Sequence, residues 1–244
     1  MQVNGYFNYF RYLNRNWDLR IALFVIAHEI RGELKYGLNT IGIDDLSSVR
    51  ENNIDTSHAT MYMPLNYFML ETLMKRIVRF PDNQGFLDMG CGRGRVVSVA
   101  AHYHFTNITG LDFSVQLCKD AIRNTERQKK KFPGITIDII NEEASHFEIP
   151  GFVNTLFFFN PFDADIMGCV LNNLLKSLEK KPRTFRVIYA NPQYKYLFLE
   201  KGFVEVYQFR KLVYLEASIL EKKETNPSFL DRMGVFLQEQ IQTG

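Results

Sequence analysis

The stretch "FLDMGCGRGRV" (residues 86–96) decides the fold of this chain. Apolar residues flank Asp88, three glycines then fall within five positions, and valines follow. The pattern predicts a buried strand that enters a glycine loop and a helix that leaves it. Loops of this kind hold nucleotide-like ligands against backbone NH groups. The first question is therefore which ligand this loop holds.

The spacing of the glycines argues against a phosphate-containing ligand. In a dinucleotide fingerprint, G-x-G-x-x-G/A, the third small residue would fall at Arg95 or Val97, and neither fits. A P-loop sequence is also absent from the chain. A carboxylate at the mouth of the loop, Asp88, would repel a pyrophosphate but attract a ligand that carries a sulfonium and an ammonium. S-adenosylmethionine is such a ligand, and D-x-G-x-G over residues 88–92 resembles the first methyltransferase motif.

The composition indicates a folded protein with a sizeable core. The chain has 244 residues, of which 46% are hydrophobic, and its formal net charge is +2. This near balance gives no strong overall field for nucleic acid, although a local site stays compatible with it. The apolar run at residues 21–27 is too short to span a bilayer, so we expect no membrane partner. The sequence gives no indication of the oligomeric state.

The cysteines and histidines predict neither a disulfide framework nor a metal site. The three cysteines, Cys91, Cys118 and Cys169, are far apart and not in CxxC spacing. That pattern is typical of a reducing compartment, and we expect a cytoplasmic protein. His102 and His104 are two residues apart, so on a helix they would point in different directions.

Residues 85–201 alternate between short apolar runs and helical stretches, which predicts an α/β fold with a parallel sheet. We predict strands at 85–88, 108–112, 135–140, 155–159 and 185–189, and helices near 94–104, 114–131, 163–180 and 193–201. Two β-rich runs then follow within residues 202–220 with no room for a helix between them, which predicts an antiparallel hairpin. Five alternating units and a terminal hairpin resemble the Rossmann-like, seven-stranded class I methyltransferase fold.

The rest of the chain flanks this core. Apolar residues at helical spacing predict helices over 17–36 and 63–80, with Gly37 as a stop and Pro64 near the first turn of the second helix. We therefore divide the chain into an N-terminal helical segment (1–80), a methyltransferase core (81–220) and a C-terminal tail (221–244) that ends in a short helix.

Further candidate cofactor ligands follow the second and third strands. Asp112 ends the second strand 24 residues after Asp88, where a carboxylate can accept both ribose hydroxyl protons; its alternative role is a helix cap, which Ser114 could also supply. Phe113 would then pack on the adenine. After the third strand, Glu143–Ala144 resembles the Asp-Ala pair by which methyltransferases bind the adenine amino group, although Glu142 could make that contact and both could be solvated.

The fourth strand runs into "NPF" (160–162), at the edge where open α/β sheets bind their ligands. The sequence partly resembles the Asn-Pro-Pro-aromatic motif of amino methyltransferases, with Phe162 in place of the second proline and Asp163 in place of the aromatic residue. Asn160 is therefore a candidate for both cofactor binding and catalysis. The resemblance is too partial to imply an adenine or glutamine substrate.

Several segments together resemble an uncharacterised family of bacterial class I methyltransferases. The resemblance covers about residues 36–215, although family members usually carry Asp where this chain has Asn39. It rests on "YGLNT" (36–40), "MYMP" (61–64), "FLDMGCGRGR" (86–95), "GLDFS" (110–114), "NPF" (160–162), "VIYANP" (187–192) and "GF" (202–203).

The resemblance implies the fold, S-adenosylmethionine as cofactor, and an N-terminal segment that closes over it. Tyr62 could then lie over the methionine end of the cofactor, as a second catalytic candidate; alternatively it is a core tyrosine. The full set of expected cofactor ligands is Asp88, Met89, Gly90, Cys91, Gly92, Asp112, Phe113, Glu143 and Asn160.

We therefore expect a methyltransferase whose acceptor is a nitrogen nucleophile on a protein side chain or a small molecule. Three alternatives stay open: a non-catalytic cofactor-binding scaffold, a nucleic-acid methyltransferase, and an aminopropyltransferase. The basic run "RNTERQKKKF" (123–132) could contact RNA, but a solvated helix end also explains it. An aminopropyltransferase needs paired acids for a polyamine, and "NPF" does not supply them.

Overall fold

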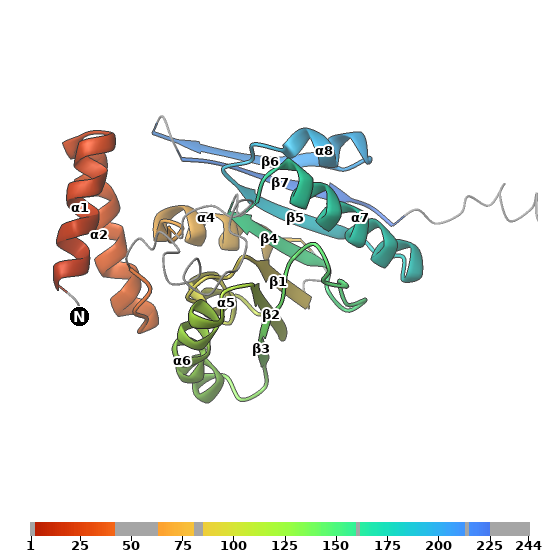
Figure 1. Cartoon of the computed structure of the whole chain (residues 1–244), viewed down its shortest axis with the longest axis horizontal. Helices are drawn as coiled ribbons and strands as arrows, with labels where there is room; N and C mark the ends of the chain where they lie inside the picture. Colours follow the sequence, from red (N-terminus) through yellow and green to blue (C-terminus); the bar gives the residue numbers. More distant parts are fainter. Residues whose placement is uncertain (1–2, 42–62, 81–84, 160–161, 213–214, 225–244) are drawn as a thin grey trace, which may run out of the picture.

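A mixed seven-stranded sheet forms the centre of the computed structural model (Figure 1). The structure describes residues 3–41, 63–80, 85–159, 162–212 and 215–224. The order of the strands is β3-β2-β1-β4-β5-β7-β6, and β7 runs antiparallel to both of its neighbours while the other pairs are parallel. The strands are β1 (Gly85–Met89), β2 (Asn107–Asp112), β3 (Thr136–Asn141), β4 (Thr155–Phe159), β5 (Phe185–Ala190), β6 (Val204–Lys211) and β7 (Leu215–Lys222).

This arrangement confirms the predicted sheet and its terminal hairpin. The five predicted parallel strands agree with the observed ones to within one residue at each end. Because β1 and β4 are neighbours although β2 and β3 lie between them in the chain, the order of the strands reverses beside β1. Open α/β sheets bind their ligands at such a reversal, outside the carboxyl ends of the strands.

Helices cover both faces of the sheet, as predicted. Phe86 and Phe157 pack with α4, α5 and α6 on one face, whereas the adjacent residues in the same strands, Leu87 and Leu156, pack with α7 and α8 on the other. The helices are α1 (Val3–Asn16), α2 (Leu19–Tyr36), α4 (Tyr67–Ile77), α5 (Arg95–Ala100), α6 (Val115–Lys131), α7 (Ala164–Lys180) and α8 (Lys195–Glu200).

The ends of two predicted helices need correction. The helix expected over 63–80 begins at Tyr67, because the Asn66 side chain caps it by accepting a hydrogen bond from the backbone NH of Phe68. Pro64, expected near the first turn, therefore lies before the cap of the helix. The helix expected near 94–104 ends at Ala100, and His104 takes a left-handed conformation with φ of 63°.

The helices α1 and α2 pack against each other beyond the edge of the sheet toward which β4 points (Figure 1). We did not predict α1, in which Tyr6, Tyr9 and Leu13 repeat at helical spacing and are buried against α2. The second helix starts after the cap Asp18 and stops at Gly37, whose φ of 66° matches the predicted stop. No helix in the described ranges has the length and apolar character that a membrane span requires.

The helix expected in the C-terminal tail lies outside the described residues, since the description ends at residue 224.

Candidate functional site

The glycine loop joins β1 to α5 and bends across the end of β2. Gly90, Gly92 and Gly94 have φ of 84°, 54° and 76°, a left-handed conformation that residues with a Cβ rarely adopt. The NH groups of Gly90 and Cys91 donate to the carbonyl of Leu111 at 2.8 and 2.9 Å. The loop is therefore fixed beside the end of β2, as a nucleotide-binding turn requires.

Asp112 connects the glycine loop to the start of α6. Its carboxylate accepts hydrogen bonds from the NH groups of Gly92 at 2.8 Å and Ser114 at 2.9 Å. Ser114 itself caps α6 through the NH of Leu117, so the capping role predicted for Ser114 is confirmed. A carboxylate has about four acceptor positions, and those that remain can serve the ribose hydroxyls.

Asp112 is a buried acid although it lies at the end of a strand. Only 6% of Asp112 is exposed. Burial raises the pKa of its carboxyl to about 6, although hydrogen bonds from the NH groups of Ser114 and Gly92 act in the opposite direction.

Asp88 lies at the end of β1 with 2% of its surface exposed. Its Oδ2 atom has no hydrogen-bond partner among the described residues. Burial raises the pKa of this carboxyl well above its usual range, and the nearby charge of Asp112 raises it further. A buried carboxylate without a partner is costly, and a cationic ligand group would remove that cost. The ammonium of S-adenosylmethionine fits this position, whereas a phosphate does not.

The side chains of Met89 and Cys91 point into the protein. Met89 is buried in the cluster that contains Leu87 and Leu111, and the Cys91 sulfur lies so close to Gly110 that a Cβ there would be 3.0 Å from it. Burial raises the pKa of the Cys91 thiol well above its usual value. Both side chains are buried, so any contact of these two residues with a cofactor would come from their backbone atoms.

The adenine candidates lie beside Asp112 at the end of β3. Glu142 and Glu143 are both exposed; the NH of Glu142 donates to the Asp112 carbonyl at 3.2 Å, and Glu143 lies 3.6 Å from His146. Phe113 is half-buried. Asn141 is not among the predicted site residues, yet its amide donates to the carbonyls of Asp112 and Phe113 at 3.0 and 2.8 Å. These hydrogen bonds connect the end of β3 to the segment that contains Asp112, the proposed ribose ligand.

Both predicted catalytic residues, Asn160 and Tyr62, lie outside the described residues. Their neighbours are placed: Phe159 ends β4 beside β5, and Phe162 is half-buried against the core. Asp163 caps α7 by accepting from the NH groups of residues 165 and 166.

Arg95 is a residue whose role the sequence did not predict. It is buried at the start of α5, where its guanidinium lies 2.7 Å from Glu29 and 3.2 Å from Glu33 of α2. It also donates to Thr40 Oγ1 and to the Leu65 carbonyl, each at 2.7 Å, and lies 4.1 Å from the centre of the Tyr67 ring.

Arg93 adds a second connection, because it donates to the carbonyl of Ile41 at 3.1 Å. The two arginines of the "GRGR" sequence therefore attach the N-terminal segment to the glycine loop.

A cavity of about 240 Å³ lies between the N-terminal helices and the carboxyl edge of the sheet. Its lining residues come from α1, α2 and the connection between them, from α4 and the segment before it, from the ends of β4 and β7, and from the residue after β5. They are Tyr9, Leu13, Trp17, Val25, Met63, Pro64, Leu65, Asn66, Met69, Phe159, Asn191, Leu215 and Glu216.

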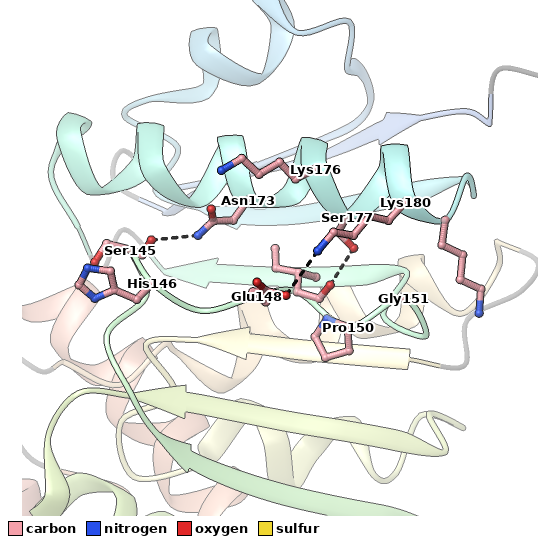
Figure 2. A pocket seen from close by; sticks show the side chains of 11 residues that line it. Ser145, His146, Glu148, Pro150, Gly151, Asn173, Lys176, Ser177 and Lys180 are labelled. Carbon is pink, nitrogen blue, oxygen red and sulfur yellow. Dashed lines mark hydrogen bonds and ion pairs between the residues drawn. The ribbon is translucent and has the colours of Figure 1, made fainter.

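Figure 2 shows a second cavity, of about 480 Å³, between α7 and the loop of residues 145–151. Asn173 donates to the Ser145 carbonyl at 2.9 Å and Ser177 to the Ile149 carbonyl at 2.7 Å, so α7 holds this loop in place. None of the predicted site residues that the structure describes lines this cavity. The described residues contain no cluster of side chains suited to a metal ion.

Comparison with known proteins identifies the class. A family model described as a methyltransferase domain matches residues 87–188. No curated protein matches the chain.

Among solved structures, a protein of Pyrococcus horikoshii OT3 is 14% identical with a TM-score of 0.50, over 71% of this chain and 99% of that one. A magnesium protoporphyrin IX methyltransferase of Synechocystis PCC 6803 with bound SAM is 14% identical, with a TM-score of 0.48 over 64% and 78% of the two chains. A putative methylase of Haemophilus influenzae is 16% identical, with a TM-score of 0.49 over 63% and 96%.

The sheet and its glycine loop define a class I, Rossmann-like methyltransferase fold. With the matched domain and the acids at Asp88 and Asp112, the protein is an S-adenosylmethionine-dependent methyltransferase, and S-adenosylmethionine is its cofactor.

Proposed function

We propose that the protein transfers the methyl group of S-adenosylmethionine to a nitrogen nucleophile, on a small molecule or a protein side chain. The observation that carries the cofactor site is the buried Oδ2 atom of Asp88 beside the glycine loop, which has no hydrogen-bond partner in the described part of the chain. Asp88 would pair with the ammonium, Asp112 would hold the ribose, and Phe113 with Glu143 or Glu142 would bind the adenine.

Bound S-adenosylmethionine supplies an electrophilic methyl group and leaves as a neutral thioether, so the protein needs little acid catalysis. Its main tasks are to align the acceptor and to exclude water. An amine must arrive without its extra proton, which passes to water. Asn160, which follows β4 directly in the sequence, would accept hydrogen bonds from the remaining N–H groups and so orient the lone pair. Tyr62 would cover the methionine end of the cofactor.

The proposal includes a cytoplasmic location, because Cys91, Cys118 and Cys169 are all free thiols. Membership of the uncharacterised bacterial family also belongs to the proposal and rests on the quoted segments. A nucleic-acid acceptor is the second candidate. Three consecutive lysines, 129–131, end α6, where they also complement the negative end of the helix dipole.

Calorimetry with S-adenosylhomocysteine and with NAD tests the cofactor assignment. We expect saturable binding of S-adenosylhomocysteine and none of NAD; tighter binding of NAD would overturn the assignment. The role of Asn160 is tested with Asn160→Ala. We expect about a hundredfold loss of methyl transfer to a surrogate amine, with S-adenosylhomocysteine affinity little changed. Unchanged transfer with a lower melting temperature would make Asn160 structural.

A further inference from the structure

The cavity of about 240 Å³ at the carboxyl edge of the sheet lies where two apolar clusters of the protein meet. Tyr9 and Val25, which line it, belong to the cluster between α1 and α2. Met69 and Leu215, which also line it, belong to the cluster on one face of the sheet, and Phe159 packs against that cluster. The wall of the cavity is therefore formed mainly by aliphatic and aromatic side chains.

Glu216 is the one charged residue in the described lining, and its carboxylate does not belong to this apolar wall. Its neighbours Leu215 and Ala217 are buried in the cluster on the sheet, and successive side chains of a strand point to opposite faces. The Glu216 carboxylate therefore lies on the other face of the hairpin, where it pairs with Arg210 at 3.2 Å. Its backbone carbonyl accepts a hydrogen bond from the NH of Asn191 at 2.8 Å. The described wall thus presents no charged side chain to a ligand.

Two observations place this cavity beside the proposed cofactor site. Asp88 of β1 pairs with Phe157 of β4, so Phe159 lies two residues further toward the carboxyl edge on the neighbouring strand. Leu65, another lining residue, accepts a hydrogen bond at its carbonyl from Arg95 at 2.7 Å. Because Arg95 begins the helix that follows the glycine loop, the cavity and the loop share this contact.

We infer that this cavity binds the methyl acceptor and that the acceptor is a neutral aromatic nitrogen compound of one or two rings, either an arylamine or a nitrogen heterocycle. This inference rests on the proposed methyltransferase function. An apolar cavity of about 150 Å³ holds benzene, so a cavity of about 240 Å³ accommodates two fused rings. Tyr9 and Phe159 provide aromatic rings against which such a ligand can pack.

The apolar wall is the reason for a neutral acceptor. Burial in apolar surroundings disfavours a charged group, so an alkylammonium or a carboxylate would lose its hydration without an ionic partner in the described wall. The nitrogen of an arylamine or of a pyridine-like ring is uncharged near neutral pH, so its lone pair is available for attack.

The transfer step balances with such an acceptor. The nitrogen lone pair forms the new N–C bond while the C–S bond breaks and its electron pair stays on sulfur. The positive charge thus moves from the sulfonium to the nitrogen. A methylated arylamine then releases a proton to water, whereas a methylated ring nitrogen of the pyridine type keeps the charge.

Isoquinoline and tetrahydroisoquinoline test this inference. They share a skeleton of two fused rings, but at pH 8 the first is neutral and the second is protonated. In calorimetry with saturating S-adenosylhomocysteine, we expect isoquinoline to bind saturably and tetrahydroisoquinoline to bind at least about tenfold more weakly. Equal affinity for the two probes, tighter binding of tetrahydroisoquinoline, or no binding of isoquinoline would overturn the inference.

Two variants of Val25, which is buried and lines the cavity, locate the binding site. Val25→Phe fills the cavity and should weaken isoquinoline binding about tenfold or more. Val25→Ala disturbs the same packing but leaves the space open, so it should keep most of the affinity. If Val25→Phe does not fold, Leu215→Phe fills the cavity from β7. Unchanged isoquinoline affinity in a folded variant with a filled cavity would contradict the assignment.

Calorimetry of S-adenosylhomocysteine on each variant separates this inference from the proposed function. If S-adenosylhomocysteine binds but isoquinoline does not, the acceptor assignment fails and the methyltransferase function stands. If S-adenosylhomocysteine does not bind to the unaltered protein, the proposed function fails.

Discussion

Asp88 is buried, and its Oδ2 atom has no hydrogen-bond partner among the described residues, at the position proposed for the ammonium of the cofactor. Because its pKa is raised, it holds a proton at pH values at which an exposed aspartate is ionised. An ammonium beside it favours the ionised form, so binding of S-adenosylhomocysteine should release a proton.

Cofactor affinity should accordingly depend on pH. We expect the affinity for S-adenosylhomocysteine to rise with pH as Asp88 and Asp112 ionise in the free protein, and then to level off. Calorimetry between pH 5 and 8, in buffers that differ in ionisation enthalpy, measures both the affinity and the released proton. Asp88→Asn should flatten this dependence, whereas Asp138→Asn, an exposed change on β3, should not. An affinity that falls as pH rises would contradict the pairing.

Asp112 serves both the loop and, in our proposal, the ribose. Asp112→Ala should weaken S-adenosylhomocysteine binding by about 1–3 kcal/mol, and it should also lower the melting temperature, because the NH groups of Gly92 and Ser114 lose their acceptor. Calorimetry and thermal denaturation measure the two effects, with Asp138→Ala as the exposed control. A lower melting temperature with unchanged affinity would leave Asp112 a structural role alone.

At the scale of the elements, one glycine sets how closely α2 and α4 pack. A Cβ on Gly32 of α2 would lie 2.1–2.5 Å from ring atoms of Tyr67 on α4. Tyr67 is fully buried, and its hydroxyl donates to Glu33 at 3.1 Å, so the ring has little room to move. In α7, by contrast, a Cβ on Gly168 would meet nothing within 4 Å.

These two helical glycines should respond to alanine in opposite directions. Alanine favours a helix interior over glycine by about 1 kcal/mol, so Gly168→Ala should raise the free energy of unfolding by up to that amount. Gly32→Ala should lower it by about 1–3 kcal/mol, because the ring of Tyr67 must shift in a packed core. Urea denaturation of both variants checks the comparison. Stabilisation by Gly32→Ala would mean that α2 and α4 pack less closely than described.

The elements of the core could be predicted because each rests on a local pattern. The run at 155–159 consists of Thr155 followed by four apolar residues, and it forms β4 with the predicted ends. The sequence does not predict α1, because the buried side of this helix consists largely of tyrosines. Tyrosine is also common in strands and on surfaces, so its spacing here does not indicate a helix. The position of Tyr67, which begins α4, depends on a cap and on a partner helix that no local window contains.

The site residues also differ in whether a local sequence pattern is enough to predict them. Asp88 and the three glycines could be predicted, since strand, acid and loop are adjacent in the sequence. The burial of Asp112 could not, because it depends on NH groups of Gly92 and Ser114 that meet only in the fold. Arg95 stands where a dinucleotide fingerprint requires a small residue, but its structural role depends on Glu29 and Glu33, which are more than sixty residues away in the chain. Ion pairs between residues so far apart have no characteristic separation in the sequence, so they cannot be predicted from it.

At the scale of the whole molecule, this ion network connects the N-terminal segment to the cofactor loop. Arg95 starts the helix that follows the loop, and it bonds to α2, to Thr40 and to Leu65. Arg93 bonds to Ile41 in the same way. If the N-terminal segment covers the cofactor, as we propose, a ligand that orders the glycine loop should also order residues 37–41.

Hydrogen exchange followed by mass spectrometry tests this coupling. On saturation with S-adenosylhomocysteine, exchange should slow in peptides that contain residues 85–114 and also in those that contain 37–41. Thr40→Val removes the hydroxyl that bonds Arg95 and Glu33 at 2.7 and 2.6 Å. This variant should reduce the protection of residues 37–41 on cofactor binding while leaving the protection of residues 85–114.

Arg95→Met should abolish the protection of residues 37–41. It should also lower the free energy of unfolding by about 3–5 kcal/mol, because Glu29 and Glu33 lose their buried partner. Protection confined to residues 85–114 in the unaltered protein would show that the cofactor binds without help from the N-terminal segment. Arg95 would then stabilise the contact between the N-terminal segment and the glycine loop, but it would not couple cofactor binding to the order of residues 37–41.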